Sequence, residues 1–233
     1  MLPPRKRIVT IDGPSGGGKS TVSRALAAKL HFTYLDTGAM YRAVAHQCRK
    51  QGMTAEESPR LAELLASLQM ELLPPLPGGD DVRVVVNGVE IGPELRTPEM
   101  GMLASQFSAL PMVRATLTRL QQEIGEGGRI VAEGRDTGTV VFPDAAWKFF
   151  LDASAEIRAQ RRAAQLRRKG ESVDEQALLA QIIKRDKDDR ERSLAPLRAA
   201  ADAIVLDSTE TPADAVVERM HAHILATSCC REE

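Results

Sequence analysis

Residues 13–20 read Gly-Pro-Ser-Gly-Gly-Gly-Lys-Ser, and this stretch constrains the fold more than any other part of the chain. The apolar residues 8–11 precede it, and residues 21–26 have a composition typical of a helix. A strand, a glycine-rich turn and a helix in this order form a loop whose backbone N–H groups surround an anion at the positive end of the helix. In this pattern Lys19 reaches the β- and γ-phosphates of a nucleoside triphosphate, and the Ser20 hydroxyl binds Mg²⁺. The alternative, a connector that only turns the chain, does not explain the spacing and the flanking sequence together.

Composition limits the classes of protein that fit. The chain has 233 residues, 43% of them hydrophobic, which suits one compact domain or one core with an inserted subdomain. A formal net charge of −1 argues against a nucleic acid or a membrane surface as the main partner. No run approaches the ~18 apolar residues of a membrane span, so we expect a soluble cytoplasmic protein, with a monomer as the default. Cys48 is expected in the core, and the roles of Cys229 and Cys230 stay open.

Short apolar strands alternate with helices along most of the chain. The expected strands are residues 8–12, 32–35, 130–132, 147–151 and 203–206. The first expected helix follows the glycine-rich loop and ends at about residue 31. The other expected helices are 37–51, 58–73, 97–125 with a break near Pro111, 153–169, 173–193 and 212–226. Thr37 is expected to cap the helix that it precedes. Five such strands predict a parallel sheet covered by helices on both faces.

Residues 70–95 differ in character from this alternation. Residues 74–79 are a cluster of proline and glycine, and residues 83–91 alternate around Asn87-Gly88, the strongest short-range signal for a β-hairpin. The sequence therefore predicts a small antiparallel insertion in an α/β core.

Several predicted strands end in an acid. For Asp152 and Asp207 we favour an ordinary capping role, because serine and threonine follow them as at helix starts. Residues 133–136 read Glu-Gly-Arg-Asp; here Glu133 can orient Mg²⁺ or its waters, and Arg135 offers a fork of donors for a phosphate. The alternative for this segment is a structural cluster of ion pairs.

Arginines elsewhere in the chain can likewise bind a phosphate or have only a structural or solvated role. Arg42, inside the helix after the second strand, can face a second phosphate or be a solvated helix residue. Residues 156–192 are rich in both charges, and most of these side chains are expected in solvent. Arg185, Asp189 and Arg192 nevertheless have the spacing of one helical face, which fits a lid that brings arginines to a phosphoryl group.

Five segments together resemble bacterial cytidylate kinases: residues 13–20, 35–42, 133–145, 150–154 and 185–190. The resemblance covers roughly residues 6–225, and residues 133–145 carry its most specific part. It implies one P-loop kinase domain over 1–233, with a five-stranded parallel sheet and helices on both faces. It also implies an acceptor-binding region at 37–125 and a helical lid at 153–193.

The resemblance further implies that the γ-phosphoryl group of ATP passes to CMP or dCMP with Mg²⁺. The implied ATP site is Gly13, Pro14, Ser15, Gly16, Gly17, Gly18, Lys19, Ser20 and Thr21. The implied CMP site is Thr37, Arg42, Ser105, Arg114, Arg135, Asp136, Arg185, Asp189 and Arg192. Within these sets Lys19, Arg135, Arg185 and Arg192 are the implied catalytic residues, and Ser20 and Glu133 hold the metal directly or through water.

Cytosine chemistry agrees with this assignment, since its N4 amine suits an acceptor such as Asp136, and its N3 and O2 suit Arg114 and Ser105. Three positions depart from the usual family residues: Thr37 replaces a common serine, Glu133 a common aspartate, and Ser20 a glycine found in some relatives. The nearest alternative is another small P-loop kinase, acting on UMP or a hydroxy acid. A more distant one is a non-catalytic nucleotide-sensing or nucleic-acid-binding protein.

Overall fold

The computed structural model describes residues 7–79, 81–168 and 170–228 and divides into two compact units. The first unit comprises residues 1–34 and 127–233, and the second comprises residues 35–126. Cys229 and Cys230 lie outside the described residues, as does Lys169, the expected end of a helix. In the part of the chain that is described, no helix is both long enough and apolar enough to cross a membrane.

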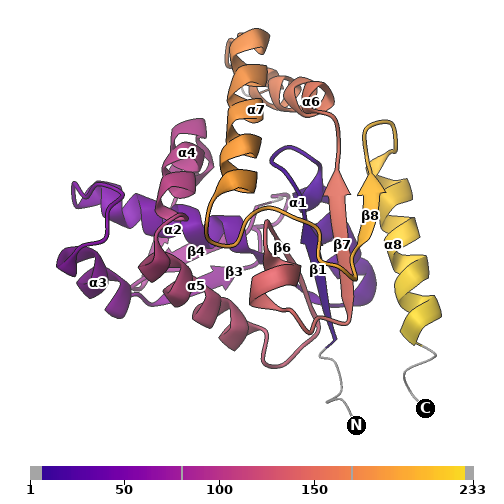
Figure 1. Cartoon of the computed structure of the whole chain (residues 1–233), viewed down its shortest axis with the longest axis horizontal. Coiled ribbons are helices and arrows are strands. Elements are labelled where there is room, and N and C mark those ends of the chain that lie inside the picture. Colours follow the sequence, from indigo (N-terminus) through magenta and orange to yellow (C-terminus); the bar gives the residue numbers. More distant parts are fainter. Residues whose placement is uncertain (1–6, 80, 169, 229–233) are drawn as a thin grey trace. The chain divides into compact units, whose positions relative to one another are not determined.

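A five-stranded parallel sheet organises the first unit, as the sequence predicted (Figure 1). Its order is β2-β6-β1-β7-β8. The strands are β1 (Ile8–Asp12), β2 (Thr33–Asp36, which begins in this unit), β6 (Ile130–Gly134), β7 (Trp147–Asp152) and β8 (Ile204–Asp207). Every residue of β1 and β6 is buried, as expected for strands covered on both faces. The central strand β1 therefore delivers its carboxyl end, Asp12, to the middle of the sheet edge.

The helices of the first unit are α1 (Lys19–Leu30), α6 (Ala155–Arg168), α7 (Glu175–Glu191) and α8 (Ala213–Ser228), with a π-helical turn, η2 (Thr137–Val141). Helices α1 and α8 pack on each other, and their apolar side chains join those of the sheet in one buried cluster. Leu26, Phe149, Leu151 and Met220 are among its largest members. Burial of this apolar surface is the main stabilising term for the unit.

Helix α6 starts two residues later than expected, because Ser154 caps it: its Oγ accepts from Ile157 N at 3.3 Å. Asp152 Oδ1 accepts from Ala153 N at 2.8 Å, and Asp207 Oδ1 accepts from Thr209 N at 2.7 Å. Neither acid caps a helix, so the expected capping role is wrong, but both make only local bonds just after their strands.

The second unit contains α2 (Thr37–Lys50), α3 (Pro59–Ala66), β3 (Met70–Leu73), β4 (Arg83–Val86), β5 (Val89–Ile91), the 3₁₀ turn η1 (Pro93–Arg96), α4 (Pro98–Phe107) and α5 (Pro111–Ile124). The predicted hairpin is present, with Asn87 and Gly88 both at positive φ. The cap at Thr97 and the helix break before Pro111 are confirmed as well. Cys48 is fully buried as expected, and burial raises the pKa of its thiol to about 11.

Two local predictions in the second unit were wrong. The expected helix 58–73 ends at Ala66, and residues 70–73 are a strand, β3, which pairs antiparallel with β4. Asn87 extends this pairing to Gln69: its Oδ1 accepts from Gln69 N at 2.8 Å, and its own N–H donates to Gln69 O at 2.9 Å. The cap of α2 is Asp36, which accepts from Ala39 N, whereas Thr37 is the first helical residue.

Candidate active site

The glycine-rich loop lies between β1 and α1 and has the shape that its glycines permit. A side chain at Gly13 would place its Cβ 2.0 Å from Leu151 O, so only glycine fits where the loop leaves the sheet. Gly18 caps α1 at φ 85°, a left-handed conformation that glycine adopts without strain. Lys19, the first residue of α1, donates from Nζ to Pro14 O at 2.6 Å. The lysine side chain thus folds back over the loop.

Lys19 is buried among charges of both signs. Burial, and then the positive charge of Arg135, lower the pKa of its ammonium to about 7, while Glu133 and Asp12 oppose the shift. Because the unfolded chain keeps the ordinary value of 10.5, it binds more protons than the folded chain between about pH 7 and 10.5. Lys19 therefore destabilises the fold below pH 7, and this destabilisation is lost as the pH rises through that window.

Ser20 and Glu133, the two predicted metal residues, lie together. Ser20 Oγ donates to Glu133 Oε1 at 2.7 Å, although 113 positions separate them in sequence. In the described residues no three side chains of histidine, cysteine, aspartate or glutamate form a metal-binding group. One hydroxyl and one carboxylate suit Mg²⁺, which usually keeps waters and phosphate oxygens as its other ligands.

Asp12 has a role that the sequence did not indicate. Its carboxylate accepts from Thr137 N at 2.8 Å, Thr137 Oγ1 at 2.7 Å and Gly138 N at 2.8 Å. Burial raises the pKa of Asp12, and these three bonds act in the opposite direction. Asp12 thereby fixes the start of η2, directly after Asp136. The sequence signal, an acid at a strand end, was the same as for four other acids.

The two residues after β6, Arg135 and Asp136, form ion pairs with Asp189 of α7 and with its C-cap, Arg192. Arg135 Nε donates to Asp189 Oδ2 at 2.9 Å, and Arg192 Nη2 approaches Asp136 Oδ1 at 3.5 Å. Burial alone would raise the pKa of Asp189, but the charges of Arg135, Arg185 and Arg192 lower it. The structure brings these five predicted residues together.

One detail of that prediction was wrong. Arg192 is the C-cap of α7, which ends at Glu191, and not a helical residue as expected, but its Nη1 still lies 4.0 Å from Asp189 Oδ1. Its guanidinium reaches Asp136 from this capping position.

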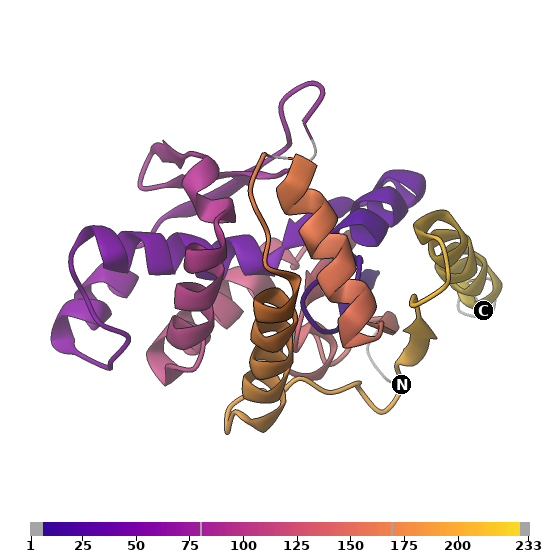
Figure 2. The same ribbon diagram turned by 90° about the horizontal axis from the view of Figure 1, so that it is seen from above.

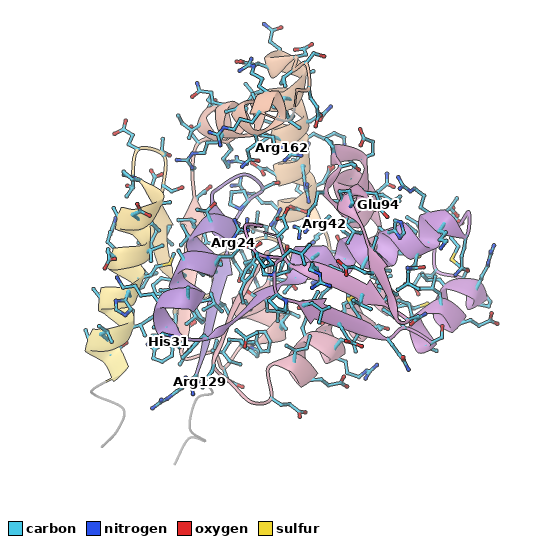
Figure 3. The ribbon with its side chains drawn as sticks, turned by 180° about the vertical axis from the view of Figure 1, so that it is seen from behind. Arg24, His31, Arg42, Glu94, Arg129 and Arg162 are labelled. Carbon is cyan, nitrogen blue, oxygen red and sulfur yellow. The ribbon has the colours of Figure 1, made fainter. Side chains whose placement is uncertain are left out.

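In the second unit the charges gather around Asp36. Arg42, labelled in Figure 3, donates from Nη2 to Asp36 Oδ2 at 3.1 Å, and Arg96 Nη1 donates to the same oxygen at 3.1 Å. Burial would raise the pKa of Asp36, but the two arginines hold it below its usual range. The alternative of a fully solvated Arg42 is therefore wrong. Arg96 was not predicted, because nothing in its spacing relates it to residues 60 positions earlier.

Ser105 and Arg114 lie in the same unit as Thr37 and Arg42. Arg114 is buried; its Nη1 donates to Ser108 O at 3.1 Å, and its guanidinium lies 5.7 Å from the centre of the Tyr41 ring. Ser108 Oγ in turn donates to Ser105 O at 2.7 Å, so α4, α5 and α2 are joined around this arginine.

A glycine-rich loop with a buried lysine, at the carboxyl end of the central strand of a parallel sheet, defines the class of P-loop nucleotide-binding proteins. The model of the family described as cytidylate kinase matches residues 9–226. A cytidylate kinase from Vibrio cholerae is 48% identical over 217 residues, covering 93% of this chain and 95% of that protein. One from Methylococcus capsulatus is 46% identical over 212 residues, covering 91% and 93%. The chain belongs to the cytidylate kinase family.

A solved structure supports the fold alone. An uncharacterised protein from Eubacterium ventriosum has a TM-score of 0.51 and 12% sequence identity, covering 93% of this chain and 97% of its own.

Proposed function

We propose that the protein transfers the γ-phosphoryl group of ATP to CMP or dCMP, giving ADP and CDP or dCDP. The observation that carries this proposal is the group of Lys19, Arg135 and Arg185 at the glycine-rich loop, in a chain of the cytidylate kinase family. Phosphoryl transfer needs positive charge near the migrating group and little covalent chemistry from the protein.

The ATP phosphates bind to the loop and the start of α1, residues 13–21. Gly16, Gly17 and Gly18 let the backbone approach the phosphates, and Lys19 leaves its bond with Pro14 O for the β- and γ-phosphates. Ser20 and Glu133 are the residues that would hold Mg²⁺. The ion supplies charge neutralisation on the phosphate oxygens.

The acceptor phosphate binds to Thr37, Arg42 and Arg135, and Arg96 supports Arg42 through their common partner, Asp36. Cytosine is selected by hydrogen bonds: Asp136 accepts from the N4 amine, and Arg114 and Ser105 donate to N3 and O2. Such a site rejects a base that does not offer the matching donors and acceptors, because buried polar groups of the protein would then lose their hydrogen bonds.

Transfer is direct and in line, without a covalent intermediate. A phosphate oxygen of the acceptor already carries negative charge at neutral pH, so it needs no dedicated general base. Lys19, Arg135, Arg185 and Arg192 neutralise the charge that develops in the transition state. Residues 153–193 act as a lid that excludes water, and residues 37–125 are the acceptor-binding region, within one kinase domain. The monomeric state, the cytoplasmic location and the lack of nucleic-acid binding stay predictions.

The shifted lysine gives a prediction for ATP binding. At pH 8 a Lys19 pKa of about 7 leaves the amine mostly neutral, whereas a bound triphosphate stabilises the ammonium. ATP binding at pH 8 should therefore be accompanied by proton uptake at Lys19. Calorimetric titrations in two buffers of different ionisation enthalpy measure this uptake, and Lys19→Met should abolish it. Equal binding enthalpies in both buffers for the unaltered protein would contradict the lowered pKa of Lys19.

A substrate panel tests the proposed function. ADP release with CMP, dCMP, UMP, AMP and shikimate as acceptors should be fastest with CMP or dCMP. Equal or faster turnover with AMP or shikimate would overturn the cytidylate assignment, and preference for UMP would favour the alternative within P-loop kinases. Salt-sensitive retention of RNA without turnover would indicate a nucleic-acid-binding protein instead.

A further inference from the structure

The side chain of Arg158, in the first turn of α6, joins three parts of the first unit. Its Nε donates to Ala153 O at 2.9 Å, and its Nη1 donates to Ser15 O, in the glycine-rich loop, at 3.1 Å. Both terminal nitrogens pair with the Asp186 carboxylate on α7, Nη1 at 3.0 Å. Only 3% of the Arg158 side chain and 7% of the Asp186 side chain are exposed. Arg158 was expected among the solvated arginines, and its burial corrects that expectation.

The bond to Ser15 O acts on the shape of the loop. In a trans peptide the N–H points opposite to the preceding carbonyl, so a fixed Ser15 carbonyl also fixes the direction of the Gly16 N–H. Gly16 has φ +79°, and a Cβ built on it would lie 3.2 Å from Arg158 Cβ. Arg158 therefore sets this part of the loop by a hydrogen bond and by close packing.

Asp186 connects the Arg158 guanidinium to α7, the helix that carries Arg185. It follows Arg185 directly, and Asp189, the partner of Arg135, lies one turn further along α7. Helices α6 and α7 are neighbours in Figure 2 and are in contact with each other. The loop, α6 and α7 thus share one buried junction, which we call the Arg158–Asp186 junction.

We propose that Arg158 and Asp186 are positioning residues, which hold the glycine-rich loop and α7 in register so that Lys19 and Arg185 meet the same phosphoryl group. This inference rests on the proposed function. Neither residue needs to touch a substrate, since both act through the loop and the helix.

The energetics of buried ion pairs favour this role over a purely stabilising one. Desolvation of two buried charges offsets most of their attraction, so an apolar pair of similar volume often stabilises a fold equally well. A misplacement of about 1 Å, however, can lower a rate on the order of a hundredfold. The junction should therefore matter more for catalysis than for stability.

The double variant Arg158→Met with Asp186→Leu separates the two roles. We expect a thermal unfolding midpoint close to that of the unaltered protein. We also expect kcat/KM for ATP to fall about ten- to a hundredfold. A double variant that keeps both the stability and the kcat/KM of the unaltered protein would overturn the proposal. If the double variant does not fold, Asp186→Asn decides, because it keeps the shape and removes the charge; unchanged kcat/KM in this folded variant would equally overturn it.

Arg167→Ala is the matched control, because Arg167 also joins α6 to α7, through the exposed Glu175, but does not contact the loop. Its replacement should lower kcat/KM far less than the double variant does, and a loss equal to that of the double variant would contradict a specific role for the junction. ATP affinity, titrated without an acceptor, should weaken only in the junction variants. Because this titration involves no CMP, its outcome is distinct from a failure of the unaltered protein to use CMP, which would contradict the proposed function.

Discussion

Lys19→Met should lower kcat on the order of a thousandfold and leave the fold intact. The variant removes the ammonium that neutralises the β- and γ-phosphate oxygens but keeps an unbranched side chain in the buried position. Because burial already disfavours the charged form of Lys19, loss of the charge should not lower stability. ADP release and the thermal unfolding midpoint together check this result.

Lys29→Met is the control for that variant. Lys29 lies in the last turn of the same helix and pairs with Glu218 at the surface. Its replacement should change neither rate nor midpoint appreciably. Wild-type kcat in Lys19→Met would refute the assignment of the glycine-rich loop as the ATP site.

Asp136→Ala should reduce the preference for cytosine more than it weakens ATP binding. Loss of a hydrogen bond to a charged group is worth about 1.5–3 kcal/mol, which corresponds to a fall of roughly ten- to a hundredfold in kcat/KM for CMP. Asp136 also lies 3.5 Å from Arg192, so its loss affects every acceptor to some degree. The ratio of kcat/KM for CMP to that for UMP removes this common effect, and the ratio should fall.

Asp144, an exposed acid eight residues further on, provides the matched control. Asp144→Ala should preserve both the ratio and the KM for ATP. An unchanged CMP-to-UMP ratio in Asp136→Ala, or a rise in the KM for ATP equal to that for CMP, would mean that Asp136 does not select the base.

The parts of the fold that the sequence predicted correctly depend on local chemistry. The six-residue loop before Lys19 is recognisable because its backbone angles require glycine. The Asn87-Gly88 pair forms a hairpin turn because both residues adopt positive φ. The five strands were identifiable because each is a short apolar run between turn residues. Segment 67–73 was misread as helix because its hydrogen-bond partners, Asn87 and the residues of β4, lie too far along the chain for short-range periodicity to indicate them.

The residues of the site also divide into those that the sequence predicted and those that it did not. Lys19, Ser20 and Glu133 were predicted from a motif and a strand end, and the structure brings them together. Arg96 was missed because its partner Asp36 lies 60 positions away. The Arg158–Asp186 junction was missed because its two residues lie 28 positions apart in a charged segment with many equivalent members. Only the packing of the elements distinguishes the buried arginine from its solvated neighbours.

The central claim is that a phosphoryl group passes directly from ATP to a cytidine monophosphate. ATP labelled in its γ-phosphoryl group, incubated with CMP and Mg²⁺, tests it most directly when the products are separated and counted. The account predicts that the label lost from ATP appears in CDP, with one CDP formed for each ADP and none in Lys19→Met. Label recovered as inorganic phosphate, or bound to the protein, would contradict it.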